Sequence, residues 1–234
     1  MNDPIGQAIA DFINTGEASD IMVNTNYTEG ETLPPSVFFR KEKKLPLIEK
    51  IALNECRGKV LDVGAAAGCH ALILQKKGFE VIALEKSILA TEVMKKRGIK
   101  NVVCIDILDF DKQGFDTILV LMNGTGIGQT LEGLLKLLLH LKKILNTNGQ
   151  ILIDSSDIRY LFEEEDGSVW IDIANSTYPG EMEYELTYKN HISRFKWLFV
   201  DFETLADVAR KAGLKTKCIA EGEHFDYLAQ LTIG

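Results

Sequence analysis

Short apolar runs alternate with helical-period segments along the chain from Lys59 to Ser156. The apolar runs are rich in Val, Ile and Leu and predict strands over residues 59–63, 79–85, 101–108, 115–122 and 150–156. The segments between them predict helices over residues 69–78, 87–98 and 130–145. Strands that alternate with helices form right-handed βαβ units, so the pattern predicts an α/β fold with a doubly wound parallel sheet.

The pattern changes after Asp154. Residues 168–175, 181–189 and 192–201 alternate or run apolar and predict a small antiparallel β insertion at about 156–200. A helix is then predicted over 202–213, followed by strands over 214–220 and 224–233. Because so few residues separate these last two strands, they are expected to pair antiparallel.

The first 44 residues are less regular. We expect a short amphipathic helix from Asp3 to Asn14, a polar and turn-rich stretch from Thr15 to Pro35, and a second helix over 45–54. The predicted organisation is a helical and irregular cover segment over residues 1–44 and one domain over 45–234 that contains the β insertion. We expect the insertion and residues 1–44 together to cover the substrate.

Composition narrows the classes of function. The chain has 234 residues and a net charge of −8, and its Lys and Arg residues are scattered apart from RKEKK at 40–44, which argues against a nucleic-acid partner. No apolar run approaches 18 residues and no basic leader precedes one, so we expect a cytoplasmic protein without a membrane partner. The four cysteines show no CxxC spacing and are expected to be free thiols.

Candidate binding residues follow four successive strands. They are the small-residue loop Gly64–Gly68 after Asp62, then Glu85, then Asp106, then the stretch LMNGTG at 121–126. The carboxyl ends of parallel strands meet at one edge of a sheet, where such folds bind ligands. Each feature alone has a simpler explanation, such as close helix packing, a solvated charge or a turn. Their occurrence in order favours a shared ligand site.

These motifs resemble the class I S-adenosylmethionine-dependent methyltransferases. The likeness rests on DVGAAAG at 62–68, LEKS with Glu85, CIDIL with Asp106, FDTILVLMNGTGI at 115–127, and the final strand HFDYLAQLTI. It covers residues 40–234 and implies a Rossmann-like, seven-stranded, mostly parallel sheet with an antiparallel last strand. FFRKEKKLPLIEKIAL at 38–53 is similar to the segment before the core of small bacterial members, in which an arginine lies near the cofactor.

The resemblance implies that S-adenosylmethionine is the cofactor. The residues expected to bind it are Arg40, Asp62, Gly64, Ala65, Ala66, Gly68, His70, Glu85, Lys86, Asp106, Ile107, Met122, Asn123 and Gly124. Ala66 departs from the family pattern because it replaces a glycine, and we expect its methyl group to require a negative φ. His70 is also explained as a packing or capping residue. Two alternatives are an NAD-binding oxidoreductase and a non-catalytic sensor of the same cofactor.

The substrate is described mainly by missing motifs. No D/N-P-P-aromatic motif or Pro-Cys pair is present, and the aspartates by which related enzymes bind magnesium or activate an amine are absent, so no metal is expected. A small-molecule substrate, or a peptide group, remains. Its candidate contacts are Asn123, Tyr27, Tyr160 and Tyr178, with Trp170 as a further aromatic residue, although packing explains each aromatic equally well.

Overall fold

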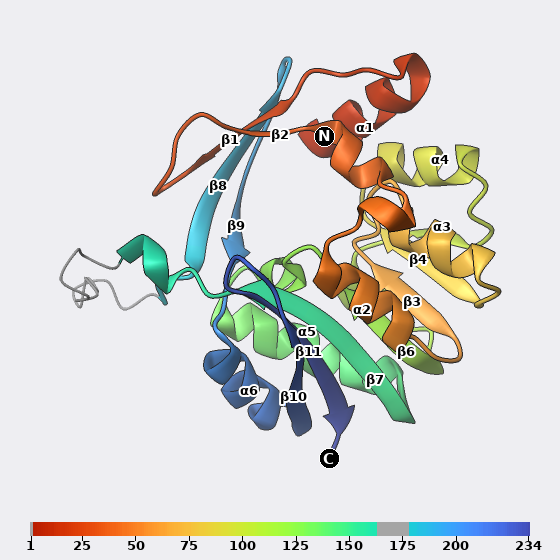
Figure 1. The fold of residues 1–234 in the computed structure, drawn as a ribbon, viewed down its shortest axis with the longest axis vertical. Helices are drawn as coiled ribbons and strands as arrows, with labels where there is room; N and C mark the ends of the chain where they lie inside the picture. The colour runs from red at the N-terminus through yellow and green to blue at the C-terminus, as the bar shows by residue number, and fades with distance from the viewer. Residues whose placement is uncertain (1, 163–177) are drawn as a thin grey trace.

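The computed structural model describes residues 2–162 and 178–234 (Figure 1). Five strands of the larger sheet run parallel: β3 (Val60–Val63), β4 (Val81–Glu85), β5 (Val102–Cys104), β6 (Phe115–Val120) and β7 (Leu145–Ser156). Two more, β10 (Leu214–Glu221) and β11 (Asp226–Ile233), complete the order β10-β11-β7-β6-β3-β4-β5. β11 is antiparallel to both β7 and β10. The predicted seven-stranded, mostly parallel sheet with an antiparallel last strand is confirmed.

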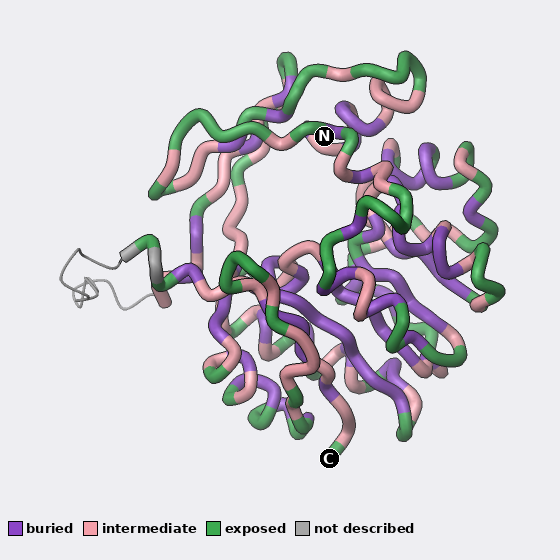
Figure 2. Tube along the Cα trace, in the orientation of Figure 1, coloured by how far each residue is buried: buried purple, intermediate pink, exposed green. Residues whose placement is uncertain are grey.

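Helices cover both faces of this sheet. They are α2 (Leu47–Glu55), α3 (Cys69–Lys76), α4 (Ile88–Lys96), α5 (Leu131–Ile144) and α6 (Phe202–Lys211). The apolar side chains of α5 and α6 pack on one face, whereas those of α2 and α3 and part of α4 pack on the other. Neighbouring strand residues therefore point into different clusters, as Leu61 and Val60 do. The central strands β3, β4 and β6 are buried along nearly their whole length, which explains their continuous apolar runs (Figure 2).

A second sheet stands at the carboxyl edge of the parallel strands (Figure 1). It follows the first helix, α1 (Pro4–Thr15), and contains β1 (Ile21–Thr25), β2 (Glu31–Leu33), β8 (Glu181–Tyr188) and β9 (His191–Leu198) in the order β2-β1-β8-β9. All its pairings are antiparallel. We call these four strands the cover sheet.

The cover sheet departs from the sequence prediction in one respect. Strands β8 and β9 lie where the insertion was predicted, but β1 and β2 occupy the stretch that was expected to be polar and irregular. Pairing with β8 explains the difference, since Met22 lies opposite Thr187 and Val23 opposite Leu186. The strand predicted over 168–175, with Trp170, lies outside the described residues.

Short 3₁₀ helices connect the larger elements. They are η1 (Pro35–Phe39), η2 (Glu42–Lys44), η3 (Ile107–Asp109), η4 (Gly124–Gly128) and η5 (Arg159–Phe162). Of these, η4 directly follows the loop after β6 and contacts both β7 and β9. It therefore joins the parallel sheet to the cover sheet. Among the described residues, no helix has both the length and the apolar composition needed to cross a membrane.

Candidate functional site

The loop after β3 lies at the carboxyl edge of the sheet. Gly64 and Gly68 both have left-handed backbones, with φ of 69° and 74°. Gly68 is also required by packing, because a Cβ there would lie 2.2 Å from the Ile99 Cδ1 atom. Asp62 fastens the loop to α3, since its buried carboxylate accepts a 3.0 Å hydrogen bond from the Ala71 N–H. The loop is thus shaped by the chain itself and presents its backbone toward the strand ends.

Ala66 adopts a backbone conformation opposite to the one predicted from sequence. Its φ is +47°, in the left-handed region, so the expectation of a negative φ is wrong. The Ala66 N–H donates to the Glu85 Oε2 atom at 3.0 Å, and this bond helps to hold the residue in a conformation that disfavours a side chain by about 1 kcal/mol. The loop therefore has a left-handed residue at position 66 although that residue is not glycine.

Glu85 ends β4 beside this loop. Its Oε1 atom accepts from the Ser87 N–H at 3.0 Å, while Oε2 accepts from Ala66, so both oxygens bind backbone at the strand end. Lys86, Asp106 and Ile107 follow β4 and β5 as predicted. The Asp106 side chain is exposed and accepts from the Leu108 N–H, whereas the neighbouring Ile107 is buried.

The loop after β6 is held by a residue that sequence reasoning missed. Met122 and Asn123 both have positive φ, at 69° and 55°. The buried carboxylate of Asp154, near the end of β7, accepts from the Met122 N–H at 3.1 Å and from the Gly124 N–H at 2.9 Å. Burial raises the pKa of Asp154 to about 6, although these N–H groups lower it. The signal in the sequence was one acid inside the apolar strand QILIDSS.

Asn123 points back toward the same strand. Its Oδ1 atom accepts from the Ser156 hydroxyl at 2.9 Å. This hydrogen bond holds the Asn123 side chain between the end of β6 and the end of β7. It is the one residue predicted for both cofactor and substrate.

Arg40 and His70 share a buried carboxylate that the sequence did not reveal as important. Glu49 of α2 accepts from the Arg40 guanidinium and from the His70 Nε2 atom, each at 2.7 Å. Burial raises the pKa of Glu49, but the two cations outweigh it and hold the pKa below its usual value. Burial lowers the pKa of His70, but Cys69, Glu49 and Asp62 together raise it by more than burial lowers it. The pKa of His70 is therefore well above its usual value.

Asp62 lies close to this ion network. Burial raises its pKa to about 6, although His70 and the Ala71 N–H lower it. Arg40 also donates from Nε to the Val37 carbonyl at 2.9 Å, so its guanidinium is fixed from two sides. The arginine predicted from the upstream motif is thus linked through Glu49 to His70, at the start of α3.

The cover sheet contributes aromatic side chains that were not predicted. Tyr184 and Phe195 face each other across β8 and β9 with ring centroids 5.9 Å apart, and Trp197 lies against η4. Tyr184 and Phe195 pack on the apolar cluster around α1 that Ala66 and Met122 also contact. The inner face of the cover sheet and one residue of each strand-end loop therefore pack on the same apolar cluster.

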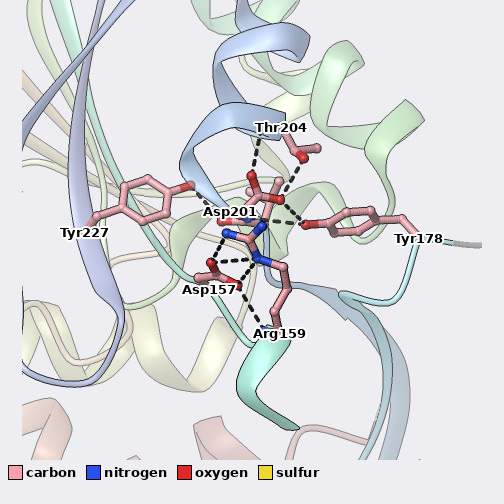
Figure 3. A network of polar contacts seen from close by, with 7 residues as sticks. Asp157, Arg159, Tyr178, Asp201, Thr204 and Tyr227 are labelled. Carbon is pink, nitrogen blue, oxygen red and sulfur yellow. Dashed lines mark hydrogen bonds and ion pairs between the residues drawn. The ribbon is translucent and has the colours of Figure 1, made fainter. Parts of the chain in front are cut away.

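The aromatic residues predicted as substrate contacts come from three separate segments of the chain. The Tyr178 hydroxyl donates to Asp201 at 2.8 Å, and Asp201 caps α6 by accepting from the Thr204 N–H (Figure 3). Tyr27 is exposed in the turn between β1 and β2. Tyr160 belongs to η5, and its side chain lies outside what the structure describes. Their role as substrate contacts stays a prediction.

Comparison with known proteins identifies the family. A SAM-dependent methyltransferase from Bacteroides fragilis, crystallised with S-adenosyl-L-homocysteine, is 44% identical to this chain, with a TM-score of 0.93 over 100% of this chain and 95% of that one. The chain therefore belongs to the S-adenosylmethionine-dependent methyltransferases. The assignment made from the sequence motifs is confirmed, and neither alternative is supported.

Other matches are more distant. The CcbJ methyltransferase of Streptomyces caelestis shares the fold, with a TM-score of 0.62 and 12% identity over 83% of this chain and 99% of that one. A 23S rRNA (uracil(747)-C(5))-methyltransferase of Pyrococcus horikoshii is 33% identical over 93 residues, which are 37% of this chain and only 23% of that enzyme. No model of a protein family matches the chain.

Proposed function

We propose that this methyltransferase acts on a small molecule held between the two strand-end loops and the inner face of the cover sheet. The observation that carries the proposal is the contact of η4 with β9, which brings the cover sheet to the loop at Met122–Gly124. A site covered by the sheet in this way would suit an acceptor of limited size. A peptide or polymer substrate would instead need an open groove along the carboxyl edge of the parallel sheet.

The residues present fit S-adenosylmethionine. Glu85 offers a carboxylate for the ribose hydroxyls, Asp106 an acceptor for the adenine amine, and Arg40 a planar cation for the carboxylate of the methionine end. Positions 64, 66 and 68 suit a cofactor without phosphate groups, because dinucleotide sites use a different glycine spacing. When bound, this cofactor supplies an electrophilic methyl group on a positively charged sulfur.

The chain's own residues would act by positioning. Asn123 is fixed by Ser156 beside the loop after β6, where its side-chain amide can orient an acceptor. Asp154 holds the same loop in its left-handed conformation. Orientation of an acceptor and exclusion of water supply a large part of the rate in such a transfer.

A small-molecule acceptor is favoured over RNA by charge. The net charge of −8 opposes a phosphate backbone, and the outer face of the cover sheet carries acidic and basic side chains in ion pairs, such as Arg194 with Glu185. We place the reaction in the cytoplasm, an assignment that the four free cysteines support.

Calorimetry tests the cofactor, and turnover tests the acceptor. S-adenosylhomocysteine should bind and NAD should not, and Glu85→Ala should weaken binding at least tenfold by removing hydrogen bonds worth about 1.5–3 kcal/mol each. Glu80→Ala is the matched control, since Glu80 lies just before β4 with an exposed side chain. Methyl-labelled cofactor should then label a metabolite fraction of a cell extract. Label that appears only in RNA would contradict the small-molecule assignment.

A further inference from the structure

The two faces of the cover sheet differ in chemistry. The Asp, Glu, Lys and Arg residues of β8 and β9 all fall on the outer face: Glu181, Glu183, Glu185, Arg194 and Lys196. Alternate positions face inward, and there the paired strands place Tyr184 opposite Phe195 and Met182 opposite Trp197. The inner face is thus aromatic and free of charged strand residues.

The inner aromatic residues form a continuous strip. The Tyr184 and Phe195 rings are nearly parallel, with 16° between their planes, and the Phe195 and Trp197 centroids are 5.9 Å apart. The strip ends at Gly126 of η4, where an added Cβ would lie 1.9 Å from the Trp197 Cε2 atom. The indole therefore rests directly on the backbone that continues from the loop at Met122–Gly124.

The strip is not simply part of a closed core. Tyr184, Phe195 and Trp197 each remain partly exposed, whereas Met182 and Leu186 on the same face are 4% exposed. Partly exposed rings that face a ligand site provide a surface for binding, because burial of their remaining area by a ligand is favourable. Tyr184 and Phe195 pack on the same apolar cluster as Ala66 and Met122, and Trp197 lies against Gly126, so the strip lies close to both cofactor loops.

We propose that the strip Tyr184–Phe195–Trp197 binds the methyl acceptor, and that the acceptor is an uncharged, flat ring compound. The inference rests on the proposed function and specifies its substrate class. A charged acceptor would need a counter-charge on this face, and the charged residues of β8 and β9 point the other way. An ammonium compound would favour rings that enclose it from several sides, whereas the Tyr184 and Phe195 rings are nearly parallel to each other and belong to one face of one sheet.

Binding of matched probes to protein saturated with S-adenosylhomocysteine tests the proposal. Phenol and indole are the flat probes, cyclohexanol is the non-planar control, and cyclohexylamine is the cationic control. Phenol should bind more tightly than cyclohexanol, and cyclohexylamine should bind least. Phe195→Leu, which keeps an apolar side chain, should weaken phenol binding by about two- to tenfold. Ile192→Leu, at an exposed outer position of the same strand, should change nothing.

Fluorescence gives a second readout. The chain has two tryptophans, so Trp170→Phe leaves Trp197 as the reporter, and indole-free flat probes such as phenol should change its emission. Equal binding of phenol and cyclohexanol, tighter binding of cyclohexylamine, or no effect of Phe195→Leu would overturn the inference. Failure of S-adenosylhomocysteine itself to bind would instead overturn the proposed function.

Discussion

Glu49→Gln is the change that most directly tests the buried ion network. Glu49 is 4% exposed and its two oxygens accept from Arg40 and from His70, each at 2.7 Å. The substitution keeps the shape of the side chain and removes the negative charge between two cations. Removal of one partner of a buried pair destabilises a protein by about 3–5 kcal/mol. His70 can release its proton in the variant, so we expect about 3 kcal/mol.

The expected loss is measurable as a change in melting temperature. For a chain of this size, each kcal/mol shifts Tm by about 2–4 °C, so Glu49→Gln should lower Tm by about 6–12 °C. Thermal unfolding followed by circular dichroism measures it. Glu80→Gln is the control, because the Glu80–Lys59 pair has its glutamate largely exposed and should contribute under about 1 kcal/mol.

The stability difference between wild type and Glu49→Gln should also depend on pH in a defined direction. Because the pKa of His70 is raised in the folded state, protonated His70 stabilises the fold fully at pH values below the ordinary histidine pKa. This contribution is lost as pH rises through the folded-state pKa. Because the pKa of Glu49 is lowered in the folded state, ionised Glu49 stabilises the fold fully at pH values above the ordinary glutamate pKa. This contribution is lost as pH falls through the folded-state pKa. The difference between wild type and variant should therefore be greatest near pH 5–6.5. A deficit no larger than that of Glu80→Gln, or one that grows with rising pH, would refute the reasoning.

Three further changes test the site. Arg40→Lys should weaken S-adenosylhomocysteine binding about tenfold and leave adenosine binding unchanged in calorimetry, because lysine keeps the charge but not the planar fork; equal loss for both ligands would assign Arg40 a structural role instead. Ala66→Gly should raise Tm by about 2–4 °C by relieving the left-handed strain of about 1 kcal/mol, and a lower Tm would show that the methyl contact matters more. Asp154→Asn leaves one acceptor for two N–H donors and should lower the unfolding free energy by about 1.5–3 kcal/mol in denaturant titrations, whereas an unchanged midpoint would mean that the loop holds itself.

The parallel sheet was predictable because its signals are local. Each strand is a short apolar run and each helix has its own period, and the order of strand-end acids follows from the topology. The same locality explains the misses. From the sequence alone, Glu49 is indistinguishable from a solvated charge on a short helix. Only the fold places Arg40 and His70 beside it.

The cover sheet shows a different limit. Its first two strands are short, and the partner of β1 in the rest of the sheet, β8, lies more than a hundred positions away in the sequence. The aromatic strip was missed for a related reason, since alternation in β8 and β9 is visible but not the direction in which each face points. The φ of Ala66 was mispredicted because residue preference was weighed without the hydrogen bond from its N–H to Glu85.

The split origin of the cover sheet has a consequence for the order of events during synthesis. Helix α1 contacts α4, and Asp3 accepts from the Ser87 hydroxyl, so this helix can dock once about the first hundred residues are available. Met22 of β1, however, can pair with Thr187 of β8 only after residue 187 has been synthesised. At ribosomal rates of about 5–20 residues per second, β1 remains without β8 for about 8–33 s. Docking of α1 can keep β1 and β2 beside the emerging domain during that interval, and the cover sheet is completed only after β8 and β9 emerge.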